Sequence, residues 1–392
     1  MRNRMKKIAC CILLLLLFSC YNYEHQNNQF FYEIFNKYAS EKDSLNRLLN
    51  DYEVQLLYTH IDKDKNNRPV FSTYGFRVDP NTYFYPAGAV RMFVAALALE
   101  RLNELNIENL DRNTLMDIGD SLQIYGPDEN TAQVKSPGSY IEEMLILGDY
   151  RAYDRLYDFL GQQYLNEKLW SKGFNRTRII HRLAADISPE LNRASNPVYF
   201  YLESSLLYSK PLQINPDIFT TPFGKTLLGE GYYKDDFLIE EPLEFTYKNF
   251  SPVTELQQAL KCLYFPESID ENKRFDLAKD DYDFLKSCLS AEKHLNKNED
   301  YPENHLEADT GFGLPGSLNR AGAGGAGMKF MVENAYYADK VNNIEFLFTA
   351  VVYINPDGIF CDDQKDYLTK GRLFFNSVLG ALYAYEKQKT VQ

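Results

Sequence analysis

Histidine, cysteine and tryptophan are scarce in this chain of 392 residues, which contains five, six and one of them respectively. No C-x-x-C and no H-E-x-x-H motif occurs. Zinc sites draw on histidine and cysteine at short, regular spacings. The sequence therefore predicts no metal site, and the histidines are more typical of surface or packing positions: His25, His60, His181, His294 and His305.

The chain also lacks a surplus of positive charge. Lys and Arg number 42 against 55 Asp and Glu, so the net charge is −13. A protein that binds nucleic acid displaces counterions with cations, which makes general nucleic-acid binding a poor interpretation here. Apolar residues make up 45% and charged residues 25%, which excludes a disordered chain. The 30 tyrosines and 26 phenylalanines suit a core, or a surface that contacts sugar or peptide.

No apolar run is long enough to cross a bilayer as a helix. The longest near the N-terminus, Ile8 to Phe18, follows four cations and predicts a signal peptide over residues 1–19. The run ends in Leu-Phe-Ser-Cys20, which resembles a bacterial lipobox, so we expect Cys20 to be lipidated. Residues 20–29 are polar and predict a tether. Cleavage after residue 19 removes four cations and leaves a net charge of −17, so the lipid would be the membrane anchor.

Three cysteines remain after this processing, which is an odd number and excludes a full disulfide framework. Two of them either pair with each other or stay as buried thiols: Cys262 and Cys288. The third is Cys361.

Hydrophobic spacing divides the rest of the chain into three stretches. The first, residues 30–80, has a helical pattern over 30–50 and then two strands, 54–61 and 70–78. The second, 81–304, is mainly helical, with helices expected near 83–105, from 140, and over 152–160, 164–172, 253–264 and 281–291; residues 175–250 are expected to form long excursions. The third, 305–392, has strands over 328–337 and 344–354 and a helix over 367–387.

Two glycine-rich segments satisfy G-x-G-x-x-G, at Gly311 to Gly316 and at Gly322 to Gly327. A dinucleotide fingerprint needs a strand before it and a helix after it, and neither segment has that context. We therefore expect no nucleotide and no other cofactor, and a flexible turn between sheet strands at the second segment.

Three short segments carry the most specific signal. The first begins Tyr83-Phe-Tyr-Pro-Ala-Gly88-Ala-Val-Arg91 and opens a helix. The second is Gly148-Asp149-Tyr150, between two helical segments. The third is Arg320-Ala-Gly322, just before the late strands.

These segments resemble, in order, the S-x-x-K, S-D-N and K-T-G motifs of serine β-lactamases, penicillin-binding proteins and related serine hydrolases. A fourth stretch, Ser188-Pro-Glu-Leu-Asn192, is similar to the omega loop of class A β-lactamases, with Ser188 where the family has Glu. The resemblance implies one β-lactamase-like α/β (α+β) domain over residues 30–392. Its three-layer αβα lobe, 30–80 plus 305–392, would have an antiparallel sheet between N- and C-terminal helices, and 81–304 would be an inserted helical lobe.

The departures from the family motifs decide the chemistry. Gly88 stands at the nucleophile position, where it offers no hydroxyl. Arg91 stands at the lysine position, and a guanidinium does not act as a base near neutral pH. Gly148 cannot shuttle a proton. No G-x-S-x-G occurs, and three nearby serines have no Lys three residues later: Ser136, Ser139 and Ser317.

The sequence therefore favours a catalytically inactive, lipid-anchored member of the bacterial cell envelope, most naturally on the outer membrane. It would act as a binding or accessory component. Arg91, Tyr150 and Arg320 are the candidate ligand-binding residues, for a peptidoglycan-like or peptide anion or an envelope protein. Two alternatives stay open: the arginines pair with local acids such as Asp149 or Glu142, or the protein is an active hydrolase that uses a non-standard residue such as Tyr85 or Tyr150.

Overall fold

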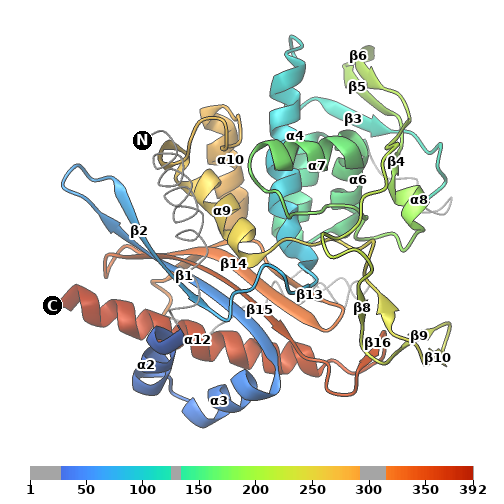
Figure 1. Cartoon of the computed structure of the whole chain (residues 1–392). Helices are drawn as coiled ribbons and strands as arrows, with labels where there is room; N and C mark the ends of the chain where they lie inside the picture. The colour runs from blue at the N-terminus through green and yellow to red at the C-terminus, as the bar shows by residue number, and fades with distance from the viewer. Residues whose placement is uncertain (1–27, 125–133, 292–314, 392) are drawn as a thin grey trace, which may run out of the picture.

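One antiparallel sheet forms the centre of the protein, in a computed structural model that describes residues 28–124, 134–291 and 315–391 (Figure 1). The strand order is β12-β14-β15-β1-β2, and β13 also pairs with β14. The bounds of these strands are β1 Glu53–Lys63, β2 Pro69–Phe76, β12 Asn319–Gly322, β13 Gly325–Gly327, β14 Phe330–Asp339 and β15 Ile344–Tyr353. Every pair in this sheet is antiparallel.

Strand β15 lies at the middle of the sheet and is buried on both faces. Phe346, Phe348 and Val352 pack into a core on one face, whereas Leu347 and Val351 pack into a core on the other. Successive side chains of a strand point to opposite faces, so a strand covered on both sides is apolar almost throughout. This explains why the sequence pattern located the strand to within a residue.

Helices from the two ends of the described chain cover one face of the sheet. They are α2 (Asn28–Tyr38), α3 (Lys42–Asp51) and the C-terminal α12 (Asp366–Val391). The apolar residues of the sequence segment 30–50 do share a buried side, with Phe31, Ile34 and Leu45 in the core. The helical pattern expected over 30–50 is nevertheless interrupted, because residues 39–41 leave the helix between α2 and α3.

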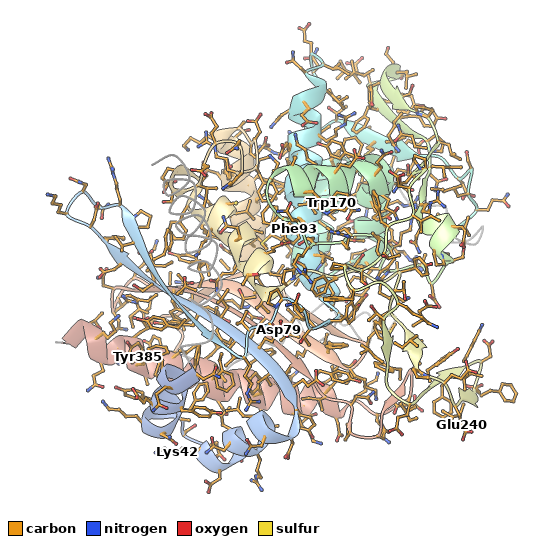
Figure 2. All side chains as sticks on the ribbon, viewed as in Figure 1. Lys42, Asp79, Phe93, Trp170, Glu240 and Tyr385 are labelled. Atoms are coloured by element: carbon orange, nitrogen blue, oxygen red, sulfur yellow. The ribbon has the colours of Figure 1, made fainter. Side chains whose placement is uncertain are left out.

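The opposite face carries α9 and the helical lobe, in which Phe93 and Trp170 lie among the helices (Figure 2). The elements are η1 Ala87–Val90, α4 Arg91–Leu105, α5 Pro137–Glu142, the π-helical turn η2 Glu143–Leu147, α6 Tyr150–Leu160, α7 Gln162–Ser171, α8 Pro189–Asn192, α9 Val253–Tyr264, η3 Pro266–Ser268 and α10 Lys279–Ser290. Helix α4 is apolar and buried almost all round, as expected of a helix that other helices surround. The interval 253–264 is the one that the sequence predicted for α9.

Residues 175–250 were expected to be excursions, and they contain eight short strands besides α8. These are β4 Ala194–Ser195, β5 Val198–Leu202, β6 Ser205–Lys210, β7 Gln213–Ile214, β8 Leu227–Leu228, β9 Gly231–Lys234, β10 Phe237–Ile239 and β11 Leu243–Glu244; β3 Leu115–Ile118 pairs with β5, and β16 Ile359–Phe360 pairs with β9. Strands of two to six residues show too little alternation to be recognised from sequence.

The glycine-rich segment 322–327 corrects an expectation, because it is not a flexible turn. Gly322 ends β12, and Gly325 to Gly327 form β13, both paired with β14. A Cβ added at Gly322 would lie 2.2 Å from the carbonyl oxygen of Asn334, and one at Gly324 would lie 2.5 Å from that of Val332. The glycines therefore allow a close approach of backbones at the sheet edge.

The architecture confirms the expected fold class: an antiparallel sheet between terminal helices and a helical lobe. Cys262 and Cys288 are buried and form no disulfide, so of the two alternatives they stay thiols. Within the described ranges no helix combines the length and the apolar character that a membrane span requires. The segment around Cys20 lies outside the described residues.

A buried acid joins α12 to the sheet. Glu386 is 1% exposed, and its carboxyl accepts a hydrogen bond from the Tyr58 hydroxyl and lies 2.8 Å from Nδ1 of His60. Burial raises the pKa of Glu386 to about 7, and burial also lowers the pKa of His60. Both shifts favour uncharged groups, so we interpret this contact at neutral pH as a hydrogen bond more than an ion pair.

This acid predicts a pH-dependent effect of substitution. A carboxyl with a raised pKa contributes stability below about pH 4.5 and loses it as the pH rises through about 7. Glu386→Gln should be near neutral at pH 5 and should stabilise the protein relative to wild type at pH 8, by about 1–3 kcal/mol. Urea unfolding at both pH values measures the difference. The exposed Glu33→Gln is the control and should show no such change; an identical effect of Glu386→Gln at pH 5 and pH 8 would contradict the assignment.

Candidate functional site

The start of α4 is the first of the segments singled out in the sequence. The turn η1 precedes it, and Gly88 is buried inside that turn. Ala87 has φ +44°, in the left-handed region that residues with a Cβ rarely occupy. Such a conformation costs about 1–3 kcal/mol and persists only where the surroundings hold it. The chain thus enters α4 through a strained turn, with no hydroxyl at its apex.

Arg91 brings three of the motif segments together. Its side chain is fully buried, and the guanidinium donates from Nε to the carbonyl of Gly88 (2.9 Å), from Nη1 to that of Met144 (2.9 Å) and from Nη2 to that of Gly324 (3.0 Å). These carbonyls belong to η1, to the turn before Gly148 and to the glycine-rich sheet edge. The planar donor fork of arginine suits such a bridge, and a lysine could not span it.

This geometry corrects the proposed role of Arg91. The residue was expected to face a cleft and to attract an anionic ligand. Instead its side chain is fully buried, and three of its N–H donors bind backbone carbonyls of three segments, which stabilises their packing. This geometry favours a structural role for Arg91, at the position that the resemblance aligns with the family's lysine.

The second segment, Gly148-Asp149-Tyr150, connects η2 to α6. Gly148 has φ +75°, a conformation that glycine adopts at little cost and that a serine would adopt only with strain. The Asp149 carboxylate caps α6, because Oδ1 accepts from the backbone N–H of Arg151 (2.7 Å) and of Ala152 (3.0 Å). Tyr150 is the first residue of α6 and is partly exposed. Two of the three positions therefore have backbone and capping roles.

Arg320, in the third segment, forms a bidentate ion pair within the sheet. Nε lies 2.8 Å from Oε1 of Glu333 and Nη2 lies 3.0 Å from Oε2, across the β12–β14 pair. Tyr337 also donates to that carboxylate, at 2.9 Å. The acid that pairs with Arg320 is thus Glu333, and neither of the acids suggested from sequence. The Glu333 carboxylate neutralises much of the positive charge with which Arg320 was expected to attract an anionic ligand. Ligand contact by Tyr150 and Arg320 stays a prediction.

The fourth segment forms a single helical turn. Ser188 caps α8 with its hydroxyl, which accepts from the backbone N–H of Leu191 (3.3 Å). Asn192 is buried, and its Oδ1 accepts from the N–H of Arg182 (2.9 Å). The turn therefore holds its neighbours in place and presents no carboxylate at the position of Ser188.

His181, one of the histidines expected at surface or packing positions, is buried and stacks on Tyr85, three residues before Gly88. The ring centroids lie 5.8 Å apart with an interplanar angle of 19°. Burial lowers the pKa of His181 to about 3, so the ring is neutral and is a weak base. Its Nε2 is buried without a hydrogen-bond partner in the described part of the chain. His181 is thus poorly suited to activate Tyr85 as a nucleophile. The sequence contains no motif from which the contact between these two residues could be predicted.

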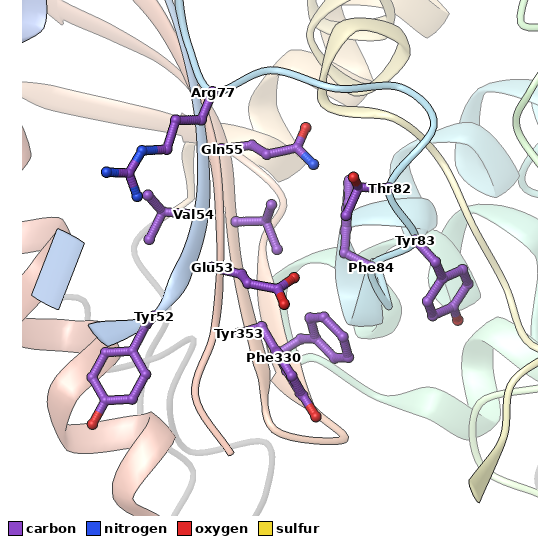
Figure 3. A pocket seen from close by; sticks show the side chains of 11 residues that line it. Tyr52, Glu53, Val54, Gln55, Arg77, Thr82, Tyr83, Phe84, Phe330 and Tyr353 are labelled. Carbon is purple, nitrogen blue, oxygen red and sulfur yellow. The ribbon is translucent and has the colours of Figure 1, made fainter. Parts of the chain in front are cut away.

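A cavity of about 460 Å³ lies at one end of the sheet, near the segment that leads into η1 (Figure 3). Glu53 and Gln55 of β1 face Thr82 and Phe84 across it, and Tyr353 stacks on Phe330 at a centroid distance of 4.5 Å. Its lining also includes Tyr52, Arg77 and Tyr83, and none of the motif residues Gly88, Arg91, Gly148 or Arg320 is part of it. Among the residues that the structure describes, no group of three potential ligands is arranged for a metal ion.

Comparison with known proteins identifies the fold. Residues 41–199 match the family model described as the beta-lactamase enzyme family. Solved structures with the same fold include the chromosome-encoded β-lactamase of Vibrio parahaemolyticus (TM-score 0.52, 13% identity, 88% of this chain and 98% of that one) and a class A β-lactamase from Mycobacterium abscessus (0.51, 14%, 87% and 98%). A β-lactamase from Desulfarculus baarsii is similar too (0.50, 11%, 87% and 96%). A search of curated proteins by sequence finds no match.

The buried guanidinium predicts a large loss of stability on a conservative change. Arg91→Lys should lower the free energy of unfolding by about 2–4 kcal/mol, because one ammonium cannot reach all three carbonyls and those left unpaired remain buried. Urea denaturation measures this. Arg68→Lys, on an exposed turn, is the matched control and should change stability by less than about 0.5 kcal/mol. Equal stability of Arg91→Lys and wild type would show that the carbonyl bridge contributes little.

Proposed function

We propose that this chain, which belongs to the serine β-lactamase and penicillin-binding-protein-like family, is an exported and lipid-anchored protein without the family's covalent catalysis. It would act as a binding or accessory component of the bacterial cell envelope. The fold is the family's, so the proposal concerns what the changed site does.

The single observation that carries the proposal is the environment of Arg91. The family's mechanism needs a hydroxyl and a base on one side of this helix, and here a glycine is followed by a guanidinium whose N–H groups point at backbone carbonyls. An arginine in this state neither accepts a proton nor releases one near neutral pH. Because nucleophile and base act as a unit, loss of both supports the absence of an acyl-enzyme.

The neighbouring motif positions support the same interpretation. Gly148 has the left-handed backbone that disfavours the family's serine, and Ser188 replaces the family's glutamate with a helix cap. Restoration of only the first motif would therefore leave the site without its proton shuttle and without a base for deacylation.

The N-terminal sequence supports export and anchoring. Four cations, an apolar run of 11 residues and Cys20 follow in the order of a lipoprotein signal, and these residues lie outside the described structure. With a net charge near −17 after cleavage, the mature chain would be repelled by anionic headgroups, which makes the lipid the attachment.

The alternative function is an active hydrolase with a non-standard residue. Tyr85 lies three residues before Gly88, and the imidazole that stacks on it belongs to the weakly basic His181. We therefore favour the inactive protein, and the next experiment separates the two.

We expect no covalent adduct with a penicillin. The purified protein is incubated with benzylpenicillin and examined by intact mass spectrometry, with an active class A β-lactamase trapped by a slow substrate as the positive control. The mass should remain that of the free protein. A mass increase of one ligand, removed by hydroxylamine, would establish an acyl-enzyme and refute the proposal.

The double variant Gly88→Ser with Arg91→Lys tests whether the first motif alone is limiting. We expect it to remain unacylated under the same conditions, because Gly148 and Tyr150 still replace the serine and the asparagine of the family's second motif. Circular dichroism confirms that the variant is folded before the mass is interpreted.

We expect Cys20 to be the anchoring residue. Replacement by Ser should move the protein from the membrane fraction to the soluble fraction of fractionated cells, because the acylated thiol is lost. Cys361→Ser, an exposed cysteine of the folded domain, is the control and should leave the protein in the membrane fraction. Unchanged membrane association of Cys20→Ser would rule out this anchor.

A further inference from the structure

A second polar cavity, of about 420 Å³, lies in the helical lobe away from the family's catalytic position. Helix α7 and the segment before it form one wall, and β4, β6 and β7 contribute the other. The volume is within the range of small-molecule sites and exceeds what a single inorganic ion would fill.

At the cavity lies Lys210, the last residue of β6, which is only 6% exposed. Its Nζ donates to the Ser195 hydroxyl at 2.9 Å, and Ser195 is itself 1% exposed. Within the described residues this is its one hydrogen-bond partner, and no carboxylate lies at ion-pair distance. An ammonium has three N–H donors, so two of them remain for another group.

The other charges near Lys210 already have partners. Asp158 of α6 forms a buried ion pair with Arg182 at 2.5 Å. Arg193 donates to the carbonyls of Asn215 and Pro216, and Arg101 pairs with Glu104. The remaining titratable groups that line the cavity are Glu167 and Tyr164 of α7 and Tyr208 of β6. Lys210 thus contributes one buried positive charge that has no ion-pair partner among the described residues.

We propose that this cavity binds a small organic monocarboxylate, with the carboxylate on the Lys210 ammonium. One such cation matches one negative charge better than the two of a phosphate ester. The rim has an apolar part, since Ile214 lines the cavity and is 62% exposed, and Gln213 adds an amide. Gly161 also lines the cavity, with φ +77°, a backbone conformation that favours glycine.

The role of Ser195 is to position the ammonium. Its hydroxyl holds Nζ through the 2.9 Å hydrogen bond, so less side-chain freedom is lost when a ligand binds. This site is separate from the family's catalytic position, and the inference stands whether or not that position is inactive.

Isothermal titration calorimetry with N-acetylglycylglycine, and with its C-terminal amide as the uncharged counterpart, tests the inference. The carboxylate should bind in about the millimolar range or tighter, as expected for a ligand of this size, and the amide at least about tenfold more weakly. Lys210→Met should bind the carboxylate at least about tenfold more weakly than wild type. Lys65→Met, on an exposed loop, makes the same change in charge and should bind like wild type.

A measurement on the wild type keeps the test independent of variant folding. Burial lowers the pKa of Lys210 to about 8, so part of the population is neutral at pH 8. Carboxylate binding should then take up protons at pH 8 and take up almost none at pH 6, as shown by titrations in buffers of different ionisation enthalpy. Equal binding of acid and amide, unchanged binding by Lys210→Met, or no carboxylate binding at all would overturn the inference.

Discussion

The arrangement of the three motif segments depends on the guanidinium of Arg91. It lies in the interior and satisfies carbonyls from η1, η2 and the sheet edge at Gly324. Burial of an unpaired charge would cost many kilocalories per mole, so these carbonyls and the cation require one another. The segments that hold the family's catalytic groups are therefore fixed here by a structural contact in the same place.

Around this contact the sheet acts as the common support of two cores. Alternate residues of β15 enter the core below α12 and the core below α9, so both sets of helices are positioned by one strand. The glycines at 322 and 324 let the edge strands come close enough for the carbonyl of Gly324 to reach Arg91. The contact between the Arg91 guanidinium and the sheet edge therefore requires both the arginine and the glycines at 322 and 324.

The sequence predicted most of the fold and less of the site, for reasons that differ by residue. A strand buried on both faces, or a helix such as α9, leaves a periodic pattern that is visible without any partner. The missing hydroxyl at Gly88 is equally visible. The role of Arg91 could not be predicted from the sequence, because the partners that it bridges include backbone carbonyls, which every residue carries. The partner of Arg320 depends on the register of β12 against β14, and the contact of Ser195 with Lys210 depends on β4 and β6, strands too short to leave a pattern.

These contacts imply that the family's motif residues, placed at these positions, would conflict with stability. A lysine at position 91 would have to be free to exchange a proton, yet the three carbonyls now around that position need permanent donors. A serine at position 148 would have to occupy a left-handed backbone conformation. A lysine at position 91 would thus leave buried carbonyls without donors, and a serine at position 148 would strain the backbone. The fold is stable with Arg91 and Gly148 because stability requires only that each buried group has its hydrogen-bond partners and that each backbone conformation is allowed. Arginine and glycine meet these requirements at positions 91 and 148 better than lysine and serine would.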